Sequence, residues 1–181
     1  MKNICSFFCI ALLFVSCQEK VDNSAQLKFE ENSKIVLANL QQWQDEDMDY
    51  SVYADDFVMY ETMFGADKDT ITLEEMKASD KRTWDYFDFK MLNEPVLLPG
   101  VNPETKEPDG SVRHYSTWEV TLPGTDSTEA RSGKIKLYES FDFNDEGKIV
   151  YQQVYGDFTG LLRHLMTKEE ASEDDGAMAE E

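Results

Sequence analysis

The chain has 181 residues, and its 37 acidic side chains outnumber its 17 lysines and arginines, which gives a formal net charge of −20. Such an acidic excess repels nucleic-acid phosphates, and no basic patch interleaved with aromatic residues offsets it. We therefore expect no nucleic-acid partner. Because 41% of the residues are hydrophobic and 12% are aromatic, the chain can bury one sizeable core, which argues against global disorder.

All three cysteines, Cys5, Cys9 and Cys17, lie within the first 17 positions. The rest of the chain therefore holds no disulfide, no cysteine-based zinc site and no catalytic thiol. The acidic stretch 45–49 is like the start of a calcium loop, but Tyr50 occupies the position that such a loop reserves for glycine. Motifs for nucleotide or zinc binding are missing as well, so we expect neither a cofactor nor a metal.

The amino-terminal segment has the features of a secretory leader. Lys2 supplies a positive charge, and Ile4 to Val15 form an apolar run of 12 residues, too short to span a hydrocarbon core of about 30 Å. The run ends at Ser16 and Cys17, an ending that resembles the bacterial lipobox. This resemblance implies a signal peptide over residues 1–17 and a lipid on Cys17, which anchors the protein to a membrane of the bacterial cell envelope, the outer membrane if the cell has one. An ordinary secretory signal with a chance cysteine is the alternative.

We expect a flexible tether over residues 18–31, one domain over 32–166 and a disordered acidic tail over 167–181. Asn32 or Ser33 can cap a first helix, whose apolar face comprises Ile35, Val36, Leu37, Leu40 and Trp43. A short strand at 57–60 and a turn at 65–69 follow. Thr72 and Glu75 then fit a capping box, which predicts a second helix that buries Leu73, Met76, Trp84 and Phe87.

The second half of the domain has the alternating pattern of antiparallel strands. We expect strands over 89–98, 111–122, 133–143 and 149–157, with a loop at 101–110, a tight turn at 144–147 and a closing helix near 161–165. The second of these strands places on one face Val112, His114, Ser116, Trp118, Val120 and Leu122. The third places together Ile135, Leu137, Glu139, Phe141 and Phe143, opposite Lys136, Tyr138, Ser140 and Asp142. The fourth places together Ile149, Tyr151, Gln153, Tyr155 and Asp157.

The order of these elements resembles the nuclear transport factor 2-like superfamily, and in particular its SnoaL-like members. Local similarity lies in residues 53–57, in 141–149, and in 155–158 before the two leucines at 161 and 162. The resemblance implies an α+β fold, a cone-shaped domain in which a strongly curved antiparallel sheet wraps around amino-terminal helices and encloses an apolar pocket. Members of this superfamily include enzymes, ligand binders and noncatalytic modules, so the fold alone does not choose between them.

In SnoaL-like enzymes an Asp or His inside the pocket moves a proton on a carbon beside a carbonyl, which makes His114 and Asp157 the candidate catalytic residues. A histidine can serve as a general base near neutral pH, although a buried histidine satisfied by a backbone partner is commoner. Asp157 could be a base, or it could cap the helix that follows it. The expected pocket lining, in which aromatic residues could also be plain core, is Tyr60, Trp118, Tyr138, Tyr151 and Tyr155.

Three functions stay open at this point. The first is binding of a small apolar or amphipathic ligand in the pocket. The second is catalysis of the isomerase or cyclase type with a pocket His or Asp as general base. The third is a noncatalytic interaction module, which forms a homodimer or binds another envelope protein through the outer sheet face that carries Tyr115, Thr117 and Glu119.

Overall fold

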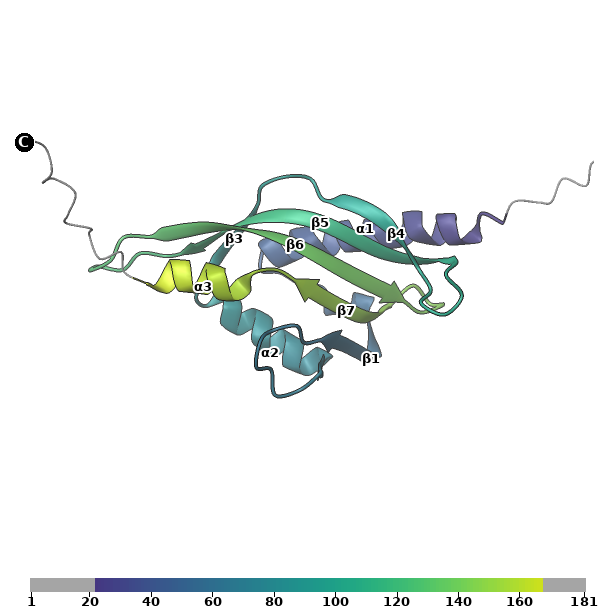
Figure 1. Cartoon of the computed structure of the whole chain (residues 1–181), viewed down its shortest axis with the longest axis horizontal. Helices are drawn as coiled ribbons and strands as arrows, with labels where there is room; N and C mark the ends of the chain where they lie inside the picture. The colour runs from purple at the N-terminus through teal and green to yellow at the C-terminus, as the bar shows by residue number, and fades with distance from the viewer. Residues whose placement is uncertain (1–21, 168–181) are drawn as a thin grey trace, which may run out of the picture.

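The computed structural model describes residues 22–167. Three α-helices cover one curved sheet (Figure 1), so the expected α+β fold class is confirmed. The elements in chain order are α1 (Ser24–Gln44), a short 3-10 helix (Tyr50–Val52), β1 (Tyr53–Tyr60), β2 (Thr70–Thr72), α2 (Leu73–Trp84), β3 (Asp88–Met91), β4 (Val96–Val101), β5 (Pro108–Leu122), β6 (Arg131–Phe143), β7 (Ile149–Tyr155) and α3 (Phe158–Met166). The leader with Cys17 and the acidic tail from residue 168 onward lie outside the described residues.

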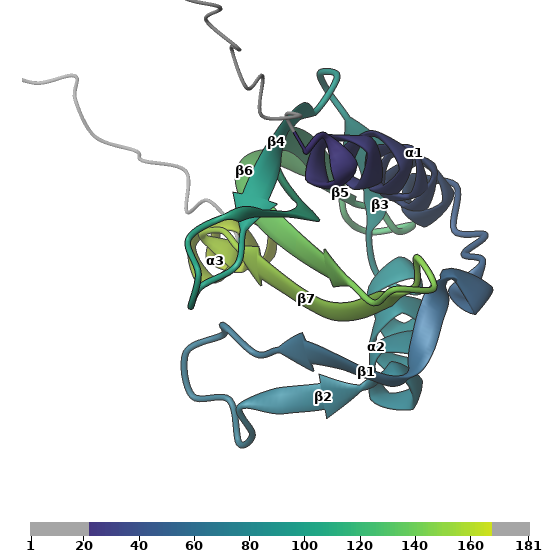
Figure 2. The same ribbon diagram turned by 90° about the vertical axis from the view of Figure 1, so that its right-hand side faces the viewer.

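The seven strands form one sheet in the order β2-β1-β7-β6-β5-β3, and β4 also pairs with β5. Every pairing is antiparallel except that of β1 with β7, which is parallel. The sheet is therefore mixed, whereas a purely antiparallel sheet was expected. The sheet bends so that β1 and β2 lie well away from β5 (Figure 2), while α1 runs beside β5 and α2 packs on β1. Within residues 22–167, no helix is both long and apolar enough to cross a bilayer.

The first helix begins at Ser24, so the expected tether is wrong for residues 24–31, and Asn32 and Ser33 are buried inside the helix rather than capping it. The early turns are held by tertiary contacts that local sequence does not reveal. Phe29 packs against the core, and Asn32 Nδ2 donates a hydrogen bond of 2.9 Å to the carbonyl oxygen of Gly110. Gly110 has a φ of +84°, and a Cβ there would lie 2.6 Å from the Cβ of Lys28. Glycine is therefore required where the start of β5 meets α1.

The capping box at the start of α2 is confirmed. The amide of Glu75 donates to Thr72 Oγ1 at 3.3 Å, and the Glu75 carboxylate accepts from the amide of Thr72 at 2.9 Å. Two of the helix's first amide groups are thereby satisfied. This fixed start determines which face of α2 meets the sheet, and Met76 is buried there.

The single strand expected over 89–98 is wrong, because Asn93, Glu94 and Pro95 interrupt it. β3 and β4 each pair with a different part of β5 instead. Proline has no amide hydrogen to donate to the sheet, which favours a break there. β4 also continues through Pro99 and Gly100 to Val101, beyond the expected strand end at residue 98.

The expected alternation of β5 is confirmed, since Val112, His114, Ser116, Trp118 and Val120 are all buried. In β6 the expected inner residues Ile135, Glu139 and Phe141 are buried, but so is Ser140 on the other face. The alternation of β7 is inverted after its first residue. Asp142 pairs with Tyr151 but Phe143 pairs with Ile149, so Val150 is the extra residue of a β-bulge. Gln152 and Val154 therefore point to the concave side, and Tyr151, Gln153 and Tyr155 point to the outer face.

Candidate functional site

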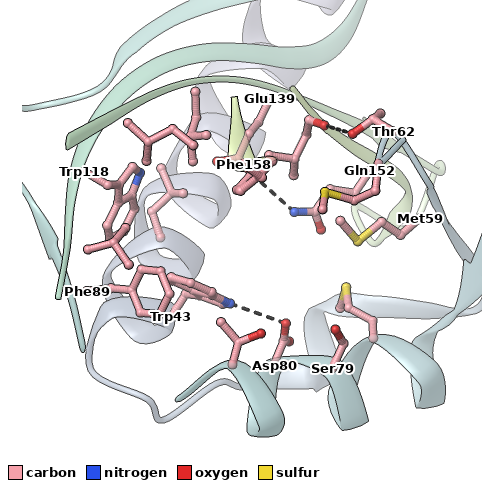
Figure 3. A pocket seen from close by; sticks show the side chains of 18 of the residues that line it. Trp43, Met59, Thr62, Ser79, Asp80, Phe89, Trp118, Glu139, Gln152 and Phe158 are labelled. Carbon is pink, nitrogen blue, oxygen red and sulfur yellow. Dashed lines mark hydrogen bonds between the residues drawn. The ribbon is translucent and has the colours of Figure 1, made fainter. Parts of the chain in front are cut away.

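A cavity of about 400 Å³ lies between α1, α2 and the concave face of the sheet. This volume falls in the range of roughly 300–1,000 Å³ that is typical of small-molecule sites. The walls are mostly apolar and include Leu40, Met76, Phe89, Trp118, Val120 and Leu161. Residues 61–63, which follow β1, complete the rim. Figure 3 shows the cavity with Asp80 and Ser79 on one wall and Glu139 and Gln152 on the opposite one.

A chain of hydrogen bonds runs along the inner end of the cavity. Asn39 Nδ2 donates to the hydroxyl of Tyr53 at 2.9 Å, and that hydroxyl donates to Gln152 Oε1 at 3.3 Å. Gln152 Nε2 in turn donates to Glu139 Oε2 at 3.4 Å. Burial raises the pKa of Tyr53 far above its ordinary value, so Tyr53 stays a neutral donor. Each donor along this chain points toward Glu139, which is its final acceptor.

Glu139 is the ionisable group at the centre of this arrangement. Its residue is only 6% exposed, yet it lines the cavity, and its neighbours on the same face of β6 are Ile135, Leu137 and Phe141. Burial raises the pKa of the Glu139 carboxyl to about 7, and the hydrogen bond from Gln152 opposes that rise only in part. A carboxyl that titrates near neutrality can accept or donate a proton under ordinary conditions.

His114 lies behind Glu139, directly opposite it in the register of β5 and β6. Its Nε2 is 3.5 Å from Glu139 Oε1, its ring stacks on Phe141, and it has no exposed surface. Neither ring nitrogen has a hydrogen-bond partner, and burial lowers the pKa of His114 to about 4. Because His114 does not line the cavity, it can act on a ligand only through Glu139.

Asp80 provides a second carboxyl on the opposite wall, one turn along α2 from Met76. It accepts hydrogen bonds from the Nε1 of Trp43 at 3.4 Å and from the hydroxyl of Tyr50 at 2.9 Å. Burial raises the pKa of Asp80, while these two donors lower it. The cavity therefore holds two partly desolvated carboxyls with apolar surface between them.

Of the five aromatic residues expected to line the pocket, the structure places two on the cavity, Tyr60 and Trp118. The expectation is wrong for Tyr138, which points outward because Leu137 and Glu139 point inward. It is also wrong for Tyr151 and Tyr155, because the bulge at Val150 turns both of them to the outer face.

Asp157 does not line the cavity. Its side chain accepts a hydrogen bond of 2.8 Å from the amide of Gly160, and so it caps α3. The capping alternative accounts for this residue, and no ligand that occupies the cavity is expected to contact it.

Sequence reasoning missed Glu139, Asp80 and Gln152 as site residues. Glu139 had a usable signal, because it is a carboxylate on a strand face that is otherwise apolar. Asp80 had a weaker one, since it is four residues from both Met76 and Trp84 on a helix. No sequence signal pointed to Gln152, because its orientation depends on the bulge at Val150. Among residues 22–167, no group of three or more His, Cys, Asp or Glu side chains is placed to hold a metal ion.

The fold is similar to that of several solved structures. A protein assigned as a polyketide cyclase from Xanthomonas campestris has a TM-score of 0.59 and 14% identity, covering 76% of this chain and 98% of that one. A SnoaL-like protein, also assigned as a polyketide cyclase, from Shewanella denitrificans has a TM-score of 0.53 and 14% identity, covering 75% of this chain and 96% of its own. A nuclear transport factor 2-like protein from Burkholderia xenovorans has a TM-score of 0.55 and 13% identity, with coverages of 75% and 96%.

Neither a family model nor a curated protein matches the sequence. At identities of this size, the similarity concerns the course of the backbone and not the chemistry of the site. The chain therefore has the fold of the SnoaL-like members of the nuclear transport factor 2-like superfamily.

Proposed function

We propose that this protein binds a small, largely apolar ligand in the cavity between α1, α2 and the sheet. The observation that carries the proposal is the cavity itself, because protein interiors are close-packed and a hollow of about 400 Å³ is not a packing defect. Polar groups stand at two places on an otherwise apolar wall, and this arrangement orients amphipathic ligands in other proteins.

Filling the cavity tests this function. Ser79 lines it from α2, and a Ser79→Trp variant places an indole where the ligand would lie. We expect the purified protein to bind one equivalent of the neutral fluorescent probe N-phenyl-1-naphthylamine, and the variant to bind it at least about tenfold more weakly. Ala78→Trp is the matched control, because Ala78 is exposed on the same helix and does not line this cavity. Equal binding by wild type and Ser79→Trp would contradict the proposal.

A second candidate function is acid–base catalysis, and Glu139 is the observation that favours it. A carboxyl with a pKa raised to about 7 faces an apolar cavity, where a substrate can approach without bulk water. This is the chemistry that an isomerase or cyclase needs, and the Xanthomonas relative is assigned as a polyketide cyclase. In this role Glu139 removes or returns a proton, and Gln152, which donates a hydrogen bond to it, holds its carboxylate in place.

We also propose that the protein is anchored to the bacterial cell envelope through a lipid on Cys17. The lipobox-like ending at Ser16 and Cys17 supports this, and α1 begins only a few residues later, at Ser24. Mass spectrometry of the mature protein is expected to find Cys17 as its first residue, carrying acyl chains. A Cys17→Ser variant is expected to leave the membrane fraction. An unmodified Cys17 in the mature protein would contradict the anchor.

The outer face of the sheet keeps the interaction-module hypothesis open. Val96, Tyr115, Tyr138 and Tyr155 stand opposite one another across β4, β5, β6 and β7, and so form one row on that face. Tyr115 and Tyr155 are about half exposed. Homodimerisation through this row stays a prediction, which light scattering on the purified protein checks.

A further inference from the structure

The charges on the cavity wall all have the same sign. Glu61, Asp80 and Glu139 line the cavity, and none of the described residues that line it is a lysine, arginine or histidine. An anionic ligand would meet three carboxyls and no counter-charge. The wall therefore disfavours carboxylates, phosphates and sulfates as ligands.

Asp80 is a partly desolvated carboxyl whose two hydrogen-bond partners are both neutral donors, Trp43 and Tyr50. Within residues 22–167, no cationic group lies within 4.0 Å of it. Lys77 is one turn away on α2, but its ammonium group pairs with Glu74 at 2.7 Å and lies over the Tyr50 ring, 5.3 Å from the centroid. Burying a carboxylate without a cationic partner costs free energy, which a positively charged ligand would offset.

Aromatic rings stand next to this carboxyl. Trp43 donates its indole N–H to Asp80, and its ring meets Phe89 edge to face at a centroid distance of 4.4 Å and Trp118 at 5.7 Å. All three rings line the cavity (Figure 3). Aromatic rings attract ammonium groups through their quadrupoles, and more strongly in a desolvated site than in water.

We infer that the ligand is a cationic amphiphile, an apolar body that carries one ammonium group, with the ammonium between Asp80 and the rings of Trp43 and its neighbours. This inference rests on the proposed ligand-binding function and adds the chemical class of the ligand. The apolar body lies toward Val120 and Leu161, and Glu139, which stands on the opposite wall, does not contact the ammonium.

Three probes that share one apolar body test the inference by isothermal titration at pH 7.5. They are 2-naphthylmethylammonium, the neutral 2-naphthylmethanol and the anionic 2-naphthoate. We expect the ammonium to bind about tenfold more tightly than the alcohol and the carboxylate to bind most weakly. In Asp80→Asn the ammonium is expected to lose about tenfold in affinity, while the affinity for the alcohol stays within about twofold.

Asp85→Asn is the matched control, because it removes one charge from the end of the same helix at an exposed residue that does not line the cavity. It is expected to keep the wild-type ranking. Equal binding of alcohol and ammonium to wild type, or an ammonium preference that survives in Asp80→Asn, overturns the inference but leaves ligand binding intact. If none of the three probes binds, both the binding function and the inference are overturned. Binding of the alcohol to Asp80→Asn reports that the variant retains a folded cavity.

Discussion

Replacing Glu139 with glutamine is expected to lower the rate of proton abstraction inside the cavity by about 10²- to 10⁴-fold, the usual contribution of a positioned general base. The test needs no knowledge of the natural substrate. 5-Nitrobenzisoxazole is a neutral, apolar carbon acid. A base removes the proton from its C3 carbon, the N–O bond breaks, and the oxygen leaves as a coloured phenolate. Wild-type protein is expected to accelerate this reaction over free acetate, because the Glu139 carboxylate is desolvated.

The pH profile distinguishes Glu139 from other bases. Proton abstraction requires the ionised carboxylate, so the rate is expected to rise with pH through about 7, the pKa of Glu139, and to level off above it. In Glu139→Gln the residual rate is expected to lack that inflection. Ser79→Trp is the second variant, because it keeps Glu139 but fills the cavity. It is expected to raise KM more than it lowers kcat. A wild-type rate no faster than that with acetate would remove the catalytic candidate while leaving ligand binding standing.

Several parts of this site could be predicted from the sequence because they depend on short-range rules. The capping box of Thr72 and Glu75 is a local pattern, and so is the alternation along β5 that buries His114 and Trp118. The position of Glu139 on a buried face follows from the same alternation. Its importance was missed because the conspicuous residues were the histidine and the tyrosines.

The remaining features depend on contacts between distant segments. The bulge at Val150 has no sequence signature, yet it turns Tyr151 and Tyr155 outward and Gln152 inward, so one extra residue removed two of the five expected lining residues. The role of Asp80 depends on Tyr50, thirty residues earlier in the chain. The early start of α1 depends on its contact with Gly110, seventy-eight residues after Asn32. Neither local propensity nor periodicity contains this information.

The arrangement of Glu139 and His114 is a compromise between stability and chemistry. A buried carboxyl and a buried imidazole whose nitrogens lack hydrogen-bond partners both cost free energy, and a well-packed core of apolar residues would avoid that cost. Such groups are common where a site needs a perturbed pKa. The cost of Glu139 can be measured directly, through its dependence on pH.

Glu139→Gln is expected to be more stable than wild type at pH 8 and nearly equal to it at pH 5. The pKa of Glu139 is raised from 4.5 to about 7 in the folded protein. The contribution of the protonated carboxyl is therefore fully present below pH 4.5 and is lost as the pH rises through 7. Wild type should lose about 2 to 3 kcal/mol between pH 5 and pH 8 that the variant, which has no carboxyl there, does not lose.

Urea unfolding followed by tryptophan fluorescence at the two pH values measures this difference. The buried His114 has its pKa lowered to about 4, so it costs stability as the pH falls below 6.5, but it does so in both proteins and cancels in the comparison. Glu129→Gln, at an exposed position in the loop between β5 and β6, is the control and is expected to show no such pH-dependent gain. If Glu139 and His114 formed a charged pair instead, the variant would leave a buried imidazolium without its partner and would be less stable than wild type near neutrality. The sign of the difference at pH 8 therefore decides whether the ionised Glu139 carboxylate is an uncompensated buried charge, as its raised pKa implies, or one half of a charged pair.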